Sequence, residues 1–166
     1  MKLTCLFPVL LIVGGLLIAG CGKSADQIKM EGDLSKEITV LHDGAMAKIT
    51  QANDLSTRIG EVMAQHDNLV KKYPKEAAGH SSDDLKAAME QIVKAKSSMD
   101  AWMKGYKPYD PAVKHAEAMK ALTTHKTDLT KMKADIEGAI TAATTAVESH
   151  TKVASELMAK MSKKKH

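Results

Sequence analysis

The sequence predicts an all-α protein, an up-down-up bundle of three helices with a long, coiled-coil-like third helix. Apolar residues recur in steps of three and four along most of the chain, which is the period of a helix that buries one face. Prolines and glycine-containing turns divide the chain into three long segments. The single phenylalanine, Phe7, lies near the N-terminus, so the core consists of Ala, Leu, Ile, Val and Met. That composition is typical of closely packed helices.

The first twenty residues have the organisation of a secretory signal peptide. Lys2 supplies a positive charge, an apolar run covers residues 6–19, and Gly20 precedes Cys21. The run is shorter than the roughly 20 apolar residues that a membrane-spanning helix requires. We therefore expect residues 1–20 to be removed from the mature protein.

Residues 17–21, Leu-Ile-Ala-Gly-Cys, resemble the bacterial lipobox. The resemblance implies that the Cys21 thiol accepts a diacylglycerol and that Cys21 becomes the acylated first residue of the mature chain, carrying palmitate-type chains. Three acyl chains exceed the two signals that stable membrane attachment usually requires. Gly22 follows the cysteine in place of an aspartate, which by resemblance to known lipoprotein sorting signals implies the outer membrane, with the protein facing the periplasm. The alternative is a lone cysteine at the end of a conventional signal.

The mature chain is predicted to consist of a lipidated tether at residues 21–32 and one helical bundle domain at residues 33–166. The first helix is expected over about residues 34–72, with Asp33 as its N-cap and Tyr73-Pro74 as its end. With Cys5 removed and Cys21 acylated, the domain has no thiol, so packing alone must stabilise it.

Two further helices complete the predicted bundle. The second covers about residues 82–104. The third begins at Asp110-Pro111, because Asp favours the N-cap and Pro the first helical position. No proline follows, so the third helix either projects as an arm or bends near Gly138. The short connections predict that consecutive helices are antiparallel neighbours.

Motifs that carry enzymatic chemistry are missing from the sequence. It has no glycine-rich phosphate loop, no nucleophile elbow and no paired zinc-ligand motif, so we expect a protein without enzymatic activity. The formal net charge is +4, with a local excess of lysine at Lys160 and residues 163–165. A solvated helix end explains these lysines better than a nucleic-acid partner does.

Histidine, methionine and tryptophan occur at helical spacing in three places. His42 and Met46 are one turn apart, Met99 and Trp102 share a helix face, and the His-to-Met spacing recurs near the start of the third helix. Up-down-up topology brings these segments to one end of the bundle. Thioether and imidazole groups suit Cu(I) where thiols are absent, and an indole can shield the ion. The candidate ligands are His42, Met46, Met99, Met103, His115 and Met119, with Trp102 as an aromatic shield.

The alternative is that these methionines fill the core and that His115 is a satisfied bundle histidine. The chain is then a structural or protein-interaction module that binds a partner along the third helix. His66, His125 and His150 lie on the apolar stripes, so we expect them to border the core.

Several short motifs resemble a group of small helical lipoproteins of Bacteroidota, most of which have no known function. The motifs are His42-Asp43 with Met46, Met99 with Trp102-Met103, and the stretch from Ala116 to Ile136. The resemblance implies a helical architecture and no established activity.

Overall fold

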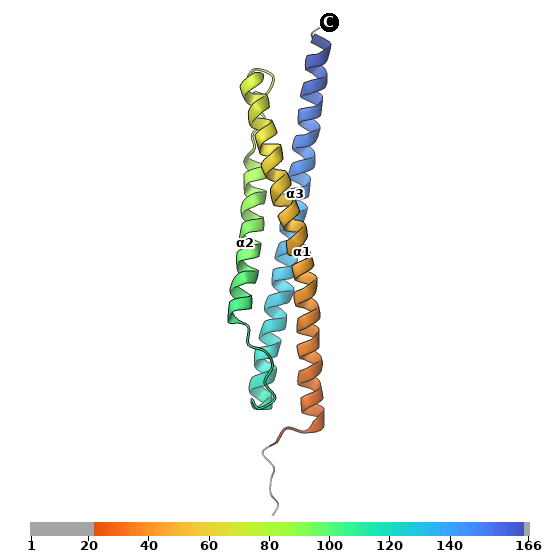
Figure 1. Ribbon diagram of the computed structural model, residues 1–166, viewed down its shortest axis with the longest axis vertical. Helices are drawn as coiled ribbons and strands as arrows, with labels where there is room; N and C mark the ends of the chain where they lie inside the picture. The colour runs from red at the N-terminus through yellow and green to blue at the C-terminus, as the bar shows by residue number, and fades with distance from the viewer. Residues whose placement is uncertain (1–21, 165–166) are drawn as a thin grey trace, which may run out of the picture.

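The computed structural model describes residues 22–164 and contains three helices packed together (Figure 1). They are α1 (Ala25–Lys72), α2 (Asp83–Gly105) and α3 (His115–Lys164). The predicted all-α bundle with a long third helix is confirmed. The expected signal peptide and Cys21 lie outside the described residues. Within the described part, no helix combines the length and apolar content needed to cross a bilayer.

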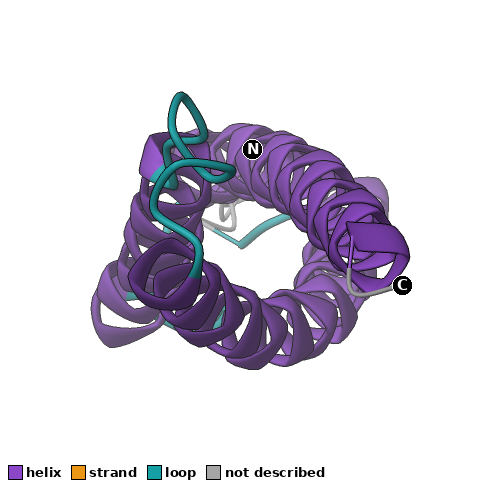
Figure 2. Ribbon diagram, turned by 90° about the horizontal axis from the view of Figure 1, so that it is seen from above, coloured by secondary structure: helices purple, strands orange, loops and turns teal. Residues whose placement is uncertain are grey.

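Contacts between helices establish the up-down-up topology. On α1 and α3, Glu31 pairs with His115, and Glu37 pairs with Lys126 at 2.8 Å, so these two helices run parallel. On α2 and α3, Trp102 contacts His125 and Asp84 contacts His150, so these two run antiparallel. Viewed down the long axis of the bundle, the described residues form helices and loops only (Figure 2).

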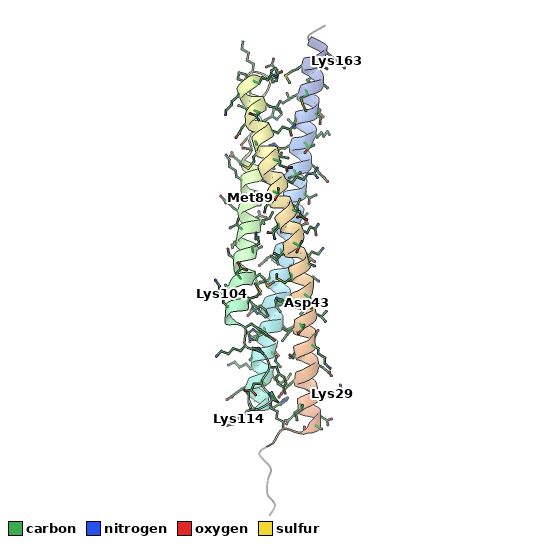
Figure 3. All side chains as sticks on the ribbon, viewed as in Figure 1. Lys29, Asp43, Met89, Lys104, Lys114 and Lys163 are labelled. Carbon is green, nitrogen blue, oxygen red and sulfur yellow. The ribbon has the colours of Figure 1, made fainter. Side chains whose placement is uncertain are left out.

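The core follows a strict seven-residue repeat on all three helices. Such a repeat is the signature of coiled-coil packing, in which equivalent positions stay on one seam. Exposed side chains such as Lys29, Asp43 and Lys104 project from the outside of the bundle (Figure 3). The buried repeat consists of Ile38, Ala45, Ala52 and Ile59 on α1, Leu85, Ile92 and Met99 on α2, and Leu122, Leu129, Ile136 and Ala143 on α3.

α1 and α3 keep one register along the bundle. Glu31 and His115 are 84 residues apart and in contact. His66 and His150, whose rings lie 5.5 Å apart, have the same separation in sequence. In the middle layers, this offset of 84 residues places a small residue of one helix level with a large residue of the other. The two helices can therefore pack closely and fill the core without aromatic rings. The matched layers are Ala45 with Leu129, Ala52 with Ile136, and Ile59 with Ala143.

α1 begins earlier than the sequence predicts. Its first residue is Ala25, not a residue near Leu34, so the expected tether at residues 21–32 is mostly helix. Ser24 is the N-cap: its hydroxyl accepts a hydrogen bond from the Gln27 backbone, and the Gln27 side chain accepts one from the Ser24 backbone. This capping box satisfies two donors that a helix start leaves unpaired. The prediction of Asp33 as the N-cap was wrong.

The predicted start of α3 was also wrong. Asp110 and Pro111 form a local turn, in which an Asp110 carboxylate oxygen accepts a hydrogen bond from the Ala112 backbone at 2.8 Å. The helix begins only at His115, and it then continues without interruption through Gly138. Its last turns reach beyond the ends of α1 and α2 (Figure 1). The longer linker leaves Tyr109 free to reach α1.

Candidate functional site

A buried carboxylate lies at the end of the bundle nearest the N-terminus. Glu31 is on the second turn of α1, and its side chain has no exposure to solvent. It is seven residues before Ile38 and therefore occupies the next position of the core repeat. Because an unpaired buried charge is strongly unfavourable, such a residue requires several partners.

Three side chains from different segments bind this carboxylate. The Lys23 ammonium, from the residues before α1, lies 2.6 Å from Oε2. The Tyr109 hydroxyl, from the linker between α2 and α3, donates to the same oxygen. The imidazole of His115, the first residue of α3, lies 2.7 Å from Oε1 through Nδ1. We call Glu31, Lys23, Tyr109 and His115 the proximal clamp.

The clamp shifts the ionisation of two of its members. Burial raises the pKa of Glu31, but the hydrogen bonds from Lys23, Tyr109 and His115 together lower it more, so the pKa is about 2. The hydrogen bond to Glu31, together with burial, raises the pKa of Tyr109 to about 12. Glu31 is thus an anion and Tyr109 a neutral donor at any physiological pH. Because an ionised carboxylate only accepts hydrogen bonds, His115 Nδ1 carries a proton.

This arrangement is suited to holding segments together. A general base needs a pKa close to the working pH and a free lone pair directed at a substrate. Glu31 has neither, because its pKa is low and both oxygens are engaged. The clamp therefore joins the residues before α1, the α2–α3 linker and the start of α3 into one unit.

An aromatic cluster lies further along the bundle. The Trp102 ring stacks on Tyr106 at 4.7 Å and on His42 at 5.8 Å between ring centroids. His125 meets Trp102 edge-on at 5.7 Å and Tyr106 at 5.0 Å. Stacked and edge-on pairs of this kind stabilise beyond the area they bury. The cluster connects α1, α2 and α3 where α2 ends.

The structure brings together only part of the predicted Cu(I) set. His42 contacts Trp102, Met99 is buried in the core, and Met46 packs against the core. Met103, by contrast, is 39% exposed. Over residues 22–164, no group of three or more His, Cys, Asp or Glu side chains is arranged to hold a metal ion.

His115 and Met119 lie elsewhere. His115 binds Glu31, which is eleven residues before His42 on α1, or about 16 Å along the helix axis. Met119 is one turn further along α3. The α1–α3 register places His125 at the level of His42 instead, and His125 is the histidine that contacts Trp102.

Sequence reasoning missed Glu31 because it assigned residues 21–32 to a tether. The seven-residue repeat contained the signal: continued backwards, it places Glu31 and His115 in the layer before Ile38 and Leu122. Continued forwards, it places His66 and His150 in the layer after Ile59 and Ala143. Polar residues at single core positions of a coiled coil specify register.

The second polar layer, His66 with His150, closes the apolar seam at the opposite end. His66 Nε2 lies 3.1 Å from the His80 carbonyl oxygen, in the α1–α2 loop. His150 Nε2 lies 2.8 Å from an Asp84 carboxylate oxygen on α2. The expectation that these histidines border the core is confirmed, and they also contact one another.

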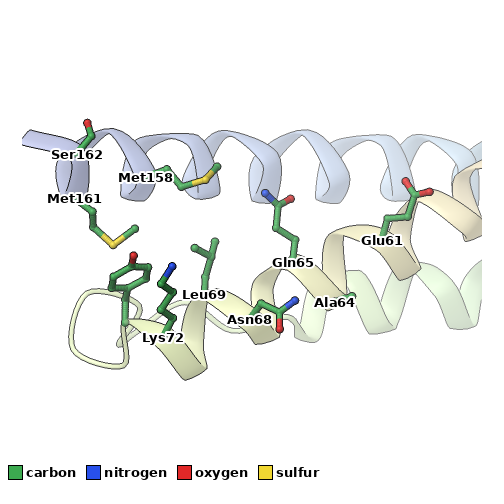
Figure 4. A pocket seen from close by; sticks show the side chains of 10 residues that line it. Glu61, Ala64, Gln65, Asn68, Leu69, Lys72, Met158, Met161 and Ser162 are labelled. Atoms are coloured by element: carbon green, nitrogen blue, oxygen red, sulfur yellow. The ribbon is translucent and has the colours of Figure 1, made fainter.

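Alongside this layer and beyond it, the ends of α1 and α3 diverge and a groove opens between them (Figure 4). Its volume is about 690 Å³. Glu61 lies at the inner end, and Lys72 lies at the outer end (Figure 4). We call this the distal groove. Its lining consists of Glu61, Ala64, Gln65, Asn68, Leu69, Lys72, Tyr73, Met158, Met161 and Ser162.

Comparisons of the chain with family models, with curated proteins and with solved structures found no match.

Proposed function

We propose that this chain is a lipid-anchored, non-enzymatic protein of the bacterial cell envelope that holds an interaction surface at a set distance from the membrane. The signal-like segment and the lipobox resemblance at residues 17–21 support the anchor. The helical bundle supports the role of a spacer. Within this proposal, Cys21 carries the lipid and the partner binds at the end of the bundle away from it.

The proximal clamp is the observation that carries the proposal. A flexible tether over residues 21–32 would allow the domain to move up to roughly 40 Å from its lipid, at about 3.3 Å per extended residue. Because α1 begins at Ala25 and Lys23 is bound to Glu31, only Gly22 separates the predicted lipid attachment from the clamp. The proximal end of the bundle is therefore kept at the membrane surface.

The length of the bundle sets the distance of the other end. α3 has 50 residues, which corresponds to about 75 Å at 1.5 Å per residue. The polar layers at Glu31 with His115 and at His66 with His150 oppose sliding of α1 against α3, because a shift would bury these groups among apolar side chains. A rod of fixed register suits a spacer.

The soft-metal alternative has less support from the contacts. His115 is engaged by Glu31, and Met99 packs within the core. His42 beside Trp102 is the part of the predicted site that would persist. A buried methionine such as Met99 more often fills space in a core than binds a metal ion.

Lipid attachment is tested by labelling with a radioactive or clickable fatty acid in a bacterial host. We expect the wild type to be labelled and to fractionate with membranes. Cys21→Ala should lose both properties, because its thiol is the acceptor. A Cys21→Ala protein that is still acylated would contradict the anchor.

The spacer role is tested by the height of the distal end above the membrane. A spin label at Ala159→Cys, in protein reconstituted into vesicles, reports its distance from lipid-bound labels. We expect a narrow distribution for the wild type and a broader one for Lys23→Ala. Lys29→Ala is the matched control, because among residues 22–164 the ion pair of Lys29 is with the exposed Asp33. Equal distributions for both variants and the wild type would contradict the role of the clamp.

A further inference from the structure

The distal groove has an apolar floor that the bundle itself leaves open. Leu69 from α1 faces Met158 and Met161 from α3 across it (Figure 4). Met158 is 45% exposed, and with Leu69 and Met161 it gives the groove a continuous apolar surface. Methionine side chains adapt to different apolar surfaces, and they are common in grooves that accept amphipathic helices.

The shape of the groove suits a helix. Along α1 its lining extends from Glu61 to Lys72, twelve residues, or about 18 Å. Over this length α1 and α3 separate, so a further helix between them would restore the packing that α1 and α3 have in the middle of the bundle (Figures 1 and 4). The groove thus has room for about three turns.

Charge around the groove selects the partner. At the outer end of the groove lysines outnumber acidic residues, and Lys72 lines the groove there, whereas Glu61 lies at the inner end. A second copy of this chain would bring the same basic end against it, which is unfavourable. The exposed charged residues around the outer end are Lys71, Lys72, Lys75, Lys160 and Lys163, against Glu76 and Glu156.

We propose that the distal groove binds an amphipathic helix with acidic flanks, supplied by a protein partner. The apolar face of that helix packs on Leu69, Met158 and Met161, and its carboxylates face the lysines around the outer end. The proposal rests on the proposed function only for the orientation of the groove away from the membrane. Binding itself does not require the lipid.

The test uses the purified full-length protein and a fluorescent designed peptide of about 14 residues, roughly four helical turns. The peptide has leucine on one face and glutamate on the flanks, and a second peptide carries lysine in place of each glutamate. By fluorescence anisotropy we expect saturable binding of the acidic peptide and binding at least about tenfold weaker for the basic one. Binding of neither peptide, or of both equally, overturns the proposal.

Variants locate the site. Met158→Glu should weaken binding of the acidic peptide by about tenfold or more. Val93→Glu is the matched control, because Val93 is 55% exposed on α2, away from the groove, and it should bind as the wild type does. Lys72→Glu should reduce the preference for the acidic peptide. If Met158→Glu binds normally, or if oleate binds in the groove while the acidic peptide does not, the partner is not an acidic helix. Loss of lipid labelling in the Cys21 experiment would leave these results unaffected.

Discussion

Tyr109 and Glu31 are 78 residues apart in the chain, and the phenol of Tyr109 donates a hydrogen bond to a carboxylate that has no exposure to solvent. The contact connects the linker before α3 to the start of α1. Together with Lys23 and His115 it makes the proximal end of the bundle a single unit. The contribution of these contacts to stability can be measured from the dependence of unfolding on pH.

Acid should weaken the fold through Glu31. Its pKa is about 2 in the folded protein and about 4.5 when unperturbed. A lowered pKa contributes stability that is present above pH 4.5 and is lost as the pH falls towards 2. Thermal unfolding followed by circular dichroism between pH 7 and pH 2 should show this loss.

Glu31→Gln should melt at a lower temperature than the wild type at pH 7 and should lose less stability between pH 4.5 and pH 2. Part of the dependence of stability on pH will persist in this variant, because hydrogen bonds and nearby lysines also lower the pKa of Asp33 and Asp83. Asp26→Asn, at an exposed position of the first turn, is the control and should follow the wild type. An identical slope for Glu31→Gln and the wild type would show that Glu31 does not ionise in this way.

High pH should destabilise the fold through ionisation of Tyr109. Its pKa is raised from 10 to about 12, so its contribution to stability is present below pH 10 and is lost as the pH rises towards 12. A spectrophotometric titration of phenolate should show a late step from Tyr109. Tyr109→Phe should remove that late step, whereas Tyr106→Phe, in the same linker, should retain it. A late step that survives in Tyr109→Phe would assign it to another residue.

The heptad core predicts that substitutions at two neighbouring residues of α2 change the free energy of unfolding by very different amounts. Ile92 is fully buried, whereas Val93 is 55% exposed. Ile92→Ala should lower the free energy of unfolding by about 2 to 5 kcal/mol, because it removes packed methyl groups and leaves a cavity. Val93→Ala should change it by less than about 0.5 kcal/mol. Urea denaturation measures both, and similar effects at the two positions would be inconsistent with this packing.

The fluorescence of Trp102, the single tryptophan, tests copper binding. Because His115 binds Glu31 and Met103 points outward, we expect Cu(I), added under reducing conditions, to cause no saturable quenching near one equivalent. Saturable quenching that disappears in Met99→Leu/Met103→Leu would instead support the soft-metal site. That double variant nearly conserves side-chain volume, so its stability should change little.

Much of the fold could be predicted from local pattern. The stripe that includes Ile38, Ala45 and Ile59 identified the buried face of α1, since a seam position is apolar whatever its partner is. The helix starts could not be placed in the same way. Asp33 and Asp110 are both good N-cap residues, yet α1 begins after Ser24 and α3 begins at His115. Capping preferences are about 1 kcal/mol, so tertiary contacts override them.

The sequence by itself determined the helical class, the three-helix order and the apolar seam, because these depend on periodicity and on breakers that act within a few residues. Only the tertiary structure decided which polar residues meet. The pairings of Glu31 with His115 and of His42 with Trp102 depend on the register between helices, and a shift of one heptad would leave every apolar stripe intact while changing all of these partners. That register is an interaction between distant segments, in which buried polar groups find partners in only one alignment.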